Sequence, residues 1–344
     1  MSESEFYADV IARLLENGTL SRELKVLVVC GAHHDRDVLQ NAGFGNVTLS
    51  NLYINPNVDL YRPYFWSTQD VENLTCKDEE FDFVIAHDGL HHCQSPHRGM
   101  LEMYRVARKG ILVFEPPDNL PTRLACWLKL GQVYEMEAVA STAYVAGGCN
   151  NTMIPNHIYR WNTRQIKAAI NSYAPWGRHG FQFFHGFAGS WERWERRAGR
   201  WGGLIVKALR PVVRMFFRLF PALGNRFAFV VLKPRIPEDL HPWVLQSNGR
   251  LELNRPWAEA RFGSPPAPKP AEGGPAVQGR AMFVDLVEER FPDLPTRAVR
   301  GMARGTSRAG TSSQSPTSTS AGPAAAPGSP GRSGSIPRRG GRPR

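Results

Sequence analysis

Cysteines and long apolar runs are scarce in this sequence, and each scarcity excludes a class of protein. The five cysteines are widely spaced and include no Cys-x-x-Cys pair, which is typical of a reduced cytosolic chain and not of a disulfide framework. Windows of about 20 residues that are free of charge, such as 38–58 and 138–159, are rich in glycine, asparagine and other polar residues, so we expect no membrane-spanning helix. The first residues, MSESEFYADV, lack a basic stretch and an apolar core, so we also expect no secretory signal. Together these absences predict a cytoplasmic protein.

Acidic residues are missing from residues 295–344, which carry nine arginines and almost no large apolar side chain. Such a segment cannot bury enough apolar surface to order itself, so we expect it to be disordered. Residues 191–235 carry eleven basic and two acidic residues, whereas residues 1–190 carry 16 basic and 20 acidic residues. The net charge of +11 therefore comes from one segment and one tail, and we expect no specific nucleic-acid partner. The tail either touches RNA or anionic lipid without specificity or has no role.

The clearest pattern lies between Phe81 and Glu115. The apolar run Phe81–Ala86 predicts a strand buried on both faces of a parallel sheet. Apolar residues at helical spacing follow in Met100–Val106, and Gly110 after two basic residues indicates the end of that helix. Ile111–Phe114 predicts the next strand. This is a βαβ unit, and ligands bind at the carboxyl ends of such strands, so we expect a site near His87–His92 and Glu115.

The N-terminal part repeats the alternation of helix and strand. An amphipathic helix is expected from Phe6 to Leu15, a buried strand at Leu24–Cys30 and a second strand at Val47–Leu49, with a short helix between the strands. Residues 52–69 are irregular and aromatic, so we expect a loop with one helical turn. The predicted fold is α/β: a Rossmann-like, doubly wound, mostly parallel sheet with antiparallel closing strands at Gly180–Phe184 and Asn225–Leu232.

Three segments in this order resemble the class I S-adenosylmethionine-dependent methyltransferases, particularly their bacterial small-molecule branch. The first is VLVVCG, the second is QDVENLTCKDEEFDFVIA and the third is LHHCQSPHRGMLEMYRVARKGILVFEP. They cover about 90 residues between Lys25 and Glu115. The resemblance implies the class I methyltransferase fold, S-adenosyl-L-methionine as cofactor, and methyl transfer to an oxygen or nitrogen of a small-molecule, glycan or lipid-linked acceptor.

The resemblance also implies which residues bind the cofactor. Gly31, followed by Ala32, forms the turn that approaches the methionine part of the cofactor. Asn51 stands where an acidic residue normally takes the ribose hydroxyls, and its amide offers both a donor and an acceptor. Asp70 would accept from the adenine amino group, and Val71 would present its backbone N–H to the adenine ring.

His87 completes this set, because it follows the fourth strand, where the methyl-bearing sulfonium is expected. The first motif departs from the family, since one glycine precedes Ala32, His33, His34 and Asp35 where the family has two or three glycines. The alternative is therefore a catalytically degenerate, methyltransferase-like binding or membrane-associated scaffold.

Four histidines lie within eleven residues, at positions 87, 91, 92 and 97. Their spacing fits no known metal motif, so we expect no metal site. His91 or His92 would act as the general base on an acceptor hydroxyl, since imidazole titrates near neutral pH. The alternative is that both histidines only pack the loop, because many methyl transfers need no more than proximity and alignment.

Residues 116–220 are expected to build the acceptor side. Leu120–Tyr134 is expected to be helical, and the segment up to Trp161 is either a surface loop or a lid of neutral hydrogen-bonding groups. In the segment 201–220, four basic residues form a stripe of about 80° on an otherwise apolar helix. One interpretation is peripheral contact with an anionic membrane at the inner membrane face. The other is that the apolar face packs on the sheet or the active site.

The expected domain organisation has three parts. Residues 1–235 form the methyltransferase-like domain, 236–262 form an extension with a small hairpin, and 263–344 form a low-complexity basic tail that is mostly disordered. One short helix, Met282–Phe291, is expected to interrupt the tail.

Overall fold

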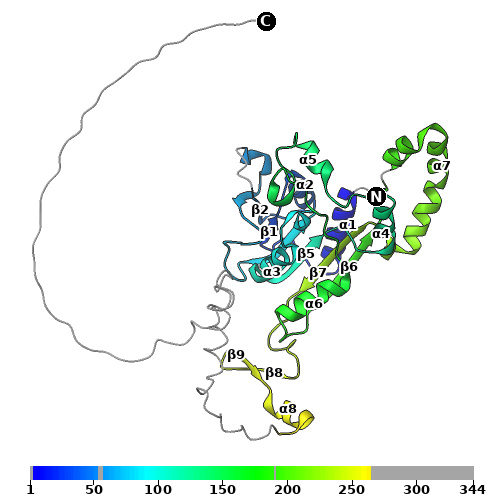
Figure 1. Cartoon of the computed structure of the whole chain (residues 1–344). Coiled ribbons are helices and arrows are strands. Elements are labelled where there is room, and N and C mark those ends of the chain that lie inside the picture. Colours follow the sequence, from blue (N-terminus) through cyan, green and yellow to red (C-terminus); the bar gives the residue numbers. More distant parts are fainter. Residues whose placement is uncertain (1–2, 53–56, 190, 265–344) are drawn as a thin grey trace, which may run out of the picture. The chain divides into compact units, whose positions relative to one another are not determined.

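The computed structural model describes residues 3–52, 57–189 and 191–264, which belong to one compact unit ending at Pro265. The expected tail helix Met282–Phe291 and the disorder of residues 295–344 lie outside the described residues. The unit contains a seven-stranded sheet in the order β3-β2-β1-β4-β5-β7-β6 (Figure 1). Its strands are β1 Val26–Val29, β2 Val47–Asn51, β3 Phe65–Thr68, β4 Phe81–His87, β5 Ala107–Phe114, β6 Gly180–Gly186 and β7 Arg226–Leu232.

The first five strands pair in parallel, and β7 pairs antiparallel with both β5 and β6. The α/β fold with antiparallel closing strands is therefore confirmed. The principal helices are α1 Glu3–Glu16, α2 His33–Asn41, α3 Pro96–Val106, α4 Leu120–Trp127, α5 Met136–Ser141, α6 Thr163–Tyr173, α7 Trp191–Leu219 and α8 Arg255–Phe262. Short 3₁₀ turns occupy Val58–Tyr61, Leu90–His92, Cys149–Asn151 and Pro221–Leu223.

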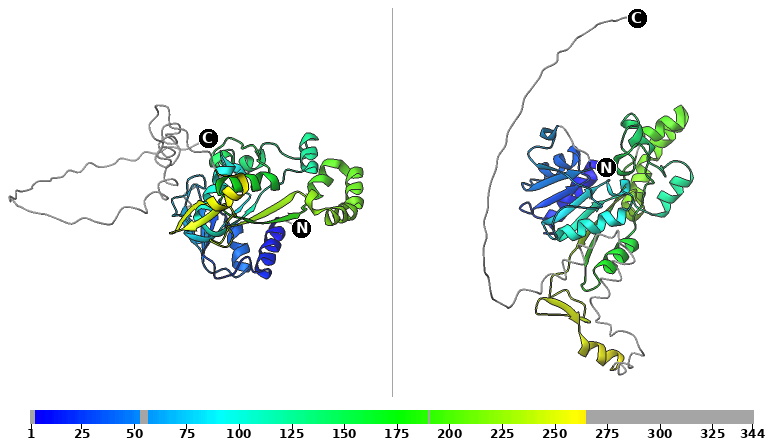
Figure 2. Two further views of the ribbon diagram at one scale, coloured as in Figure 1. Left: turned by 90° about the horizontal axis from the view of Figure 1, so that it is seen from below. Right: turned by 60° about the vertical axis from the view of Figure 1, so that its left-hand side comes forward.

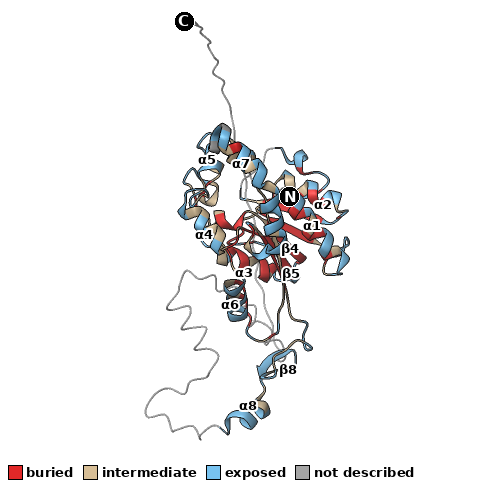
Figure 3. Cartoon of the chain, turned by 90° about the vertical axis from the view of Figure 1, so that its right-hand side faces the viewer, coloured by how far each residue is buried: buried red, intermediate tan, exposed pale blue. Residues whose placement is uncertain are grey.

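Both faces of the sheet are covered, which explains why its strands read as continuous apolar runs. Successive residues of a strand point to opposite faces. Thus Val26, Val28 and Ile85 pack with α1 and α2, whereas Leu27 and Val84 pack with α3 and α6. Figure 3 shows the buried strands between these two layers of helices.

Three local expectations were wrong. Residues 52–69 are not only a loop, because β3 pairs in parallel with β2 from Thr48 to Asn51. The helix after β4 ends at Val106, so Gly110 is not its C-terminal residue but lies within β5. A Cβ on Gly110 would lie 2.5 Å from the carbonyl oxygen of Val231, so the glycine allows β7 to approach closely. The helix expected at Leu120–Tyr134 is also shorter and ends at Trp127.

Helix α7 has its apolar surface exposed. The helix breaks at Gly199, whose φ is 68°, and Glu195 before the break pairs with Arg210 after it. Figure 2 shows α7 apart from the sheet in both views. The expectation that its apolar face packs on the sheet is therefore wrong for the residues described. None of the helices in the described part of the chain has the length and apolar character needed to cross a bilayer.

A small hairpin follows the sheet, as expected for the 236–262 segment. Strands β8 Val244–Ser247 and β9 Arg250–Leu253 pair antiparallel. The turn between them contains Asn248 and Gly249, both with positive φ, as a two-residue hairpin turn requires.

Candidate active site

A cavity of about 270 Å³ opens at the carboxyl ends of three parallel strands. Cys30 follows β1, Asn51 ends β2 and Asp88 follows β4, and all three line it. The opposite wall comes from the segment between α5 and Asn151. A larger hollow of about 660 Å³ lies along α1 and α2, but no strand end contributes to it. The sheet-edge cavity is therefore the candidate site, as expected for a doubly wound sheet.

The turns after β1 and β4 approach each other very closely at the cavity. A Cβ on Gly89 would lie 2.3 Å from the Cβ of Cys30. Any other residue at position 89 would push these turns apart. A glycine is thus required in the turn after the fourth strand, although the resemblance drew attention only to the first.

The predicted residues Gly31, Ala32 and Asn51 form one connected turn. The Gly31 N–H donates to the carbonyl of Ser50 at 2.7 Å, and the Asn51 side-chain amide donates to the Gly31 carbonyl at 3.1 Å. The Ala32 N–H donates to Asp35 Oδ2 at 2.8 Å. Of these residues, only Asn51 lines the cavity. Gly31 and Ala32 instead support it, because their turn fixes the Asn51 side chain.

The predicted pair Asp70 and Val71 lies beside the same cavity. Val71 lines it, and so does Gln69, whereas Asp70 is not among the lining residues. Asp70 Oδ1 accepts the backbone N–H of Glu72 at 2.9 Å, which fixes the turn that carries Val71.

His87 lies away from these residues. It has the same strand parity as Phe83 and Ile85, and its ring stacks on Tyr7 of α1 with centroids 4.6 Å apart. It does not line the cavity with Asn51 and Val71. The structure therefore does not place His87 beside the other residues that were expected to bind the cofactor.

The four clustered histidines separate into three locations. His87 faces α1, and His97 Nε2 lies 2.8 Å from the hydroxyl of Tyr159. His91 and His92 remain neighbours in the 3₁₀ turn after β4, and His92 lines the cavity.

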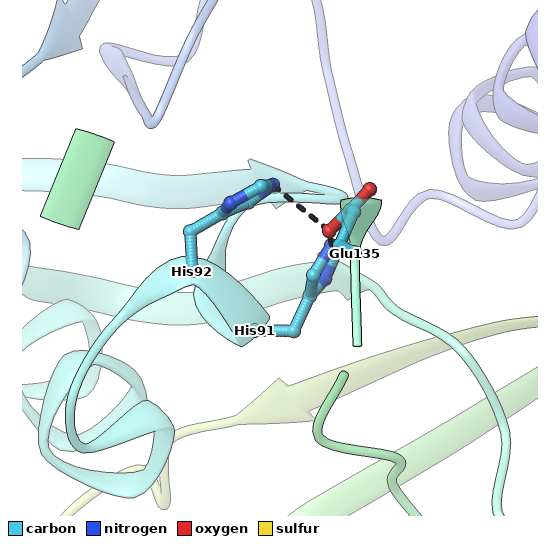
Figure 4. A group of neighbouring side chains, drawn as sticks. All are labelled: His91, His92 and Glu135. Carbon is cyan, nitrogen blue, oxygen red and sulfur yellow. Dashed lines mark ion pairs between the residues drawn. The ribbon is translucent and has the colours of Figure 1, made fainter. Parts of the chain in front are cut away.

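The ring of His91 lies between two glutamates, Glu115 and Glu135, and Figure 4 shows it with Glu135. Its Nδ1 lies 2.7 Å from Glu115 Oε2, and its Nε2 lies 3.1 Å from Glu135 Oε2. The Glu115 side chain is fully buried, and its other oxygen accepts the Leu90 N–H at 2.7 Å. His92 Nε2 lies 3.4 Å from the same oxygen of Glu135. Asn156 holds this arrangement by donating to the His91 carbonyl at 2.9 Å and to Glu135 at 3.2 Å.

The two histidines differ in their electrostatic surroundings. Burial alone lowers the pKa of His91, but Glu115 and Glu135 outweigh it and hold this pKa well above its ordinary value. Burial and the neighbouring His91 lower the pKa of His92. Burial raises the pKa of Glu135, but its contacts with His91 and His92 give a net lowering. The cluster thus combines an imidazolium, a neutral imidazole and a carboxylate at neutral pH.

Sequence reasoning missed Glu135. It lies in an irregular segment two positions before Glu137, and no spacing connects it with His91, which precedes it by 44 positions. Glu115 was expected near the site because it follows β5, but nothing in the sequence indicated that it would contact His91.

Comparison with known proteins gives a match to a family model described as a methyltransferase domain, over residues 50–114. No curated protein sequence matches the chain. Among solved structures, one similar protein is a possible histamine N-methyltransferase from Thermotoga maritima, with 12% identity, a TM-score of 0.38, and coverage of 67% of this chain and 91% of that one.

A second is the magnesium protoporphyrin IX methyltransferase from Synechocystis PCC 6803 with bound SAH, with 15% identity, a TM-score of 0.38, and coverage of 67% of this chain and 83% of that one. A putative methyltransferase from Bacillus halodurans has 17% identity and a TM-score of 0.34, over 66% of this chain and 98% of that one.

The matched residues 50–114 run from the end of β2 to the end of β5 and include Asn51, Val71 and His92 of the cavity. The strand order around them is that of a doubly wound sheet closed by antiparallel strands. The chain therefore carries a match to a methyltransferase domain over residues 50–114, within a doubly wound sheet closed by antiparallel strands.

Proposed function

We propose that this methyltransferase transfers the methyl group of S-adenosyl-L-methionine to an oxygen or nitrogen of a polar small-molecule, glycan or lipid-linked acceptor, and that the sheet-edge cavity is where transfer occurs. The observation that carries the proposal is that Asn51, Val71 and His92 line one cavity within the segment that matches the methyltransferase family.

The cofactor would lie along the ends of β1 and β2. Asn51 retains one amide hydrogen and one oxygen lone pair for ribose hydroxyls after its contacts with Gly31 and Leu52. Val71 would provide an apolar surface for the adenine ring, and Asp70, which is adjacent in the chain but does not itself line the cavity, would accept from the adenine amino group. His87 is not included in this assignment, because it stacks on Tyr7 outside the cavity.

The acceptor would enter from the side of Asn150 and Asn151, which line the opposite wall. In the transfer, an acceptor lone pair forms the new bond to the methyl carbon, and the carbon–sulfur bond breaks with its electron pair remaining on sulfur. An acceptor hydroxyl must also lose its proton. We assign that proton to His92, which lines the cavity, while His91 is a positioning residue because its two ring nitrogens contact Glu115 and Glu135.

Binding of the cofactor tests this proposal directly. S-adenosyl-L-methionine should stabilise the full chain in a saturable way in thermal unfolding, because a ligand that binds only the folded state shifts the equilibrium. Asp70→Ala should weaken cofactor binding by about 1–3 kcal/mol if Asp70 bonds the adenine amino group. The absence of saturable stabilisation at millimolar cofactor would leave the degenerate scaffold as the better description.

A second candidate function, peripheral membrane attachment, is supported by the exposed face of α7. At about 100° per residue, its exposed apolar residues fall within an arc of about 140°. These are Trp201, Leu204, Ile205, Leu209, Val212, Met215, Phe216 and Leu219. The basic stripe is centred about 150° away, largely on the opposite side of the helix, where Arg210 and Lys207 contact Glu195 and Arg214 lies over Trp191. An apolar face opposite a basic face suits the interface of an anionic bilayer.

Helix α4 would extend this apolar surface. Leu120, Leu124 and Trp127 are exposed along one of its sides. Asn119 at its start donates to the carbonyls of Ala222 and Gly224, which follow α7. The two apolar helices are therefore tied together at one end, and a lipid-linked acceptor would meet both of them.

Co-sedimentation with phosphatidylglycerol vesicles tests the membrane contact. A double variant, Leu209→Glu with Phe216→Glu, should reduce binding by at least about ten-fold, because each buried side chain contributes about 1.5–3 kcal/mol. Leu253→Glu is the matched control, since Leu253 is also exposed but lies on β9. Equal sedimentation of the double variant and the control would contradict the role of α7, and the unchanged tail would then be the source of binding.

A further inference from the structure

We propose that His91, His92 and Glu135 form a binding site for one divalent transition-metal ion of the zinc class. The three side chains come from the turn after β4 and from the residue before α5, and Figure 4 shows them converging. One ligand atom of each lies within 4.8 Å of the others. In the described part of the chain, no other group of three such side chains does so. This inference goes beyond the proposed methyl transfer and does not depend on it.

The distances match those of a tetrahedral site. Zinc bonds imidazole nitrogen and carboxylate oxygen at about 2.0–2.2 Å, so two ligand atoms of a tetrahedron lie roughly 3.3 Å apart. Glu135 Oε2 lies 3.1 Å from His91 Nε2 and 3.4 Å from His92 Nε2. Two of the three edges are therefore already at the expected length, and a small rotation of His92 would bring in the third.

Glu115 supplies the outer support that such sites require. Metal-binding histidines usually donate their other ring N–H to a carboxylate, which fixes the ring and raises its basicity. His91 Nδ1 lies 2.7 Å from the buried Glu115 Oε2, and Glu115 is itself held by the Leu90 N–H. With Nδ1 protonated, the ion would bind Nε2 and release to solvent the proton that Nε2 otherwise donates to Glu135.

Asn156 orients the remaining ligand. It is 3% exposed, and its amide donates to Glu135. Its Oδ1 is buried and has no hydrogen-bond partner among the described residues. A neutral oxygen beside the cluster would suit a water bound to the ion.

The chemistry of the ligands selects the ion. Imidazole favours zinc and its transition-metal neighbours over magnesium and calcium, which prefer oxygen ligands. Three protein ligands leave one position open, which is typical of catalytic and not of structural zinc sites. Because Nε2 of His92 has a single lone pair, it cannot bind an ion and accept a proton at the same time, so in the metal-bound state His92 is a ligand and not the base assigned above. The alternative is that no ion binds and His91 donates a hydrogen bond to each of the two glutamates. The experiment must exclude this alternative.

Titration calorimetry of the full chain with Zn²⁺ tests the site, together with metal analysis after dialysis. We expect one tightly bound equivalent, and no comparable binding of Mg²⁺ or Ca²⁺. His92→Gln and Glu135→Gln should each weaken Zn²⁺ binding by at least about ten-fold, and Glu115→Gln by about 10- to 100-fold. His241→Gln, which alters a histidine stacked on Trp243, is the matched control and should retain the affinity of the unmodified chain.

Circular dichroism would confirm that each variant is folded, and His92 and Glu135 are suitable because their side chains are 27% and 23% exposed. The absence of a stoichiometric Zn²⁺ site, or equal affinity in the His92 and Glu135 variants and the control, would overturn the inference. Cofactor binding measured on the same samples separates the two proposals. Zn²⁺ binding without S-adenosyl-L-methionine binding would refute only the proposed transfer site, and the reverse would refute only the metal site.

Discussion

Removing the carboxylate of Glu115 should strongly destabilise the fold, because this side chain is fully buried and has two close partners. It accepts the Leu90 N–H and contacts His91 Nδ1, both at 2.7 Å. Glu115→Ala leaves both groups buried without an acceptor. Removing one member of a buried charge pair lowers the free energy of unfolding by about 3–5 kcal/mol. Glu115→Gln keeps one oxygen for Leu90, so we expect a smaller loss of about 1–2 kcal/mol, close to that of one hydrogen bond.

Urea unfolding followed by far-ultraviolet circular dichroism measures these losses. Glu16→Ala is the matched control, because Glu16 is exposed at the end of α1, and surface substitutions usually change stability by no more than about 0.5 kcal/mol. The expected order of loss is Glu115→Ala, then Glu115→Gln, then the control. If Glu115→Ala lost less than about 1 kcal/mol, the bridge from Leu90 to His91 would not be the contact that fixes this turn.

Three further predictions concern the sheet, a buried acid and the cofactor. Gly110→Ala should destabilise the fold by about 1–3 kcal/mol, because its Cβ would lie 2.5 Å from the Val231 carbonyl; an unchanged melting temperature would contradict this. Burial raises the pKa of Asp35 to about 7, so the folded chain binds one proton more than the unfolded chain between about pH 4 and 7. Its stability should therefore fall by up to about 4 kcal/mol as the pH rises through that range, and Asp35→Asn should remove this part of the pH dependence in urea titrations. Asn51→Ala should weaken S-adenosyl-L-methionine binding by about 1–3 kcal/mol, and calorimetry that shows equal affinity would exclude Asn51 from the cofactor site.

Local pattern was sufficient for most of the sheet. The runs at Leu24–Cys30 and Phe81–Ala86 are continuous because both faces of each strand are covered, and this made them recognisable. The strand β3 was missed because it is short and at the edge, where Phe65 is exposed and neither face imposes a pattern.

The position of His87 follows from strand geometry. It alternates with Ala86 and shares a face with Phe83 and Ile85, which pack toward α1 and α2. The cavity instead opens toward the other layer, which contains Val71 and Leu90. The sequence predicted which residues of β4 share a face. It did not predict which of the two helix layers borders the cavity.

The sequence by itself determined the alternation of strands and helices, the resemblance to a methyltransferase, and the segment in which the site lies, because these depend on neighbours within a few residues. Only the tertiary structure decided that His91 lies between Glu115 and Glu135, and that Cys30 meets Gly89. These contacts join residues at the ends of different strands, and they also include Glu135, which follows α4 in the chain. Their distances are set by strand order and crossover, and not by any spacing along the chain.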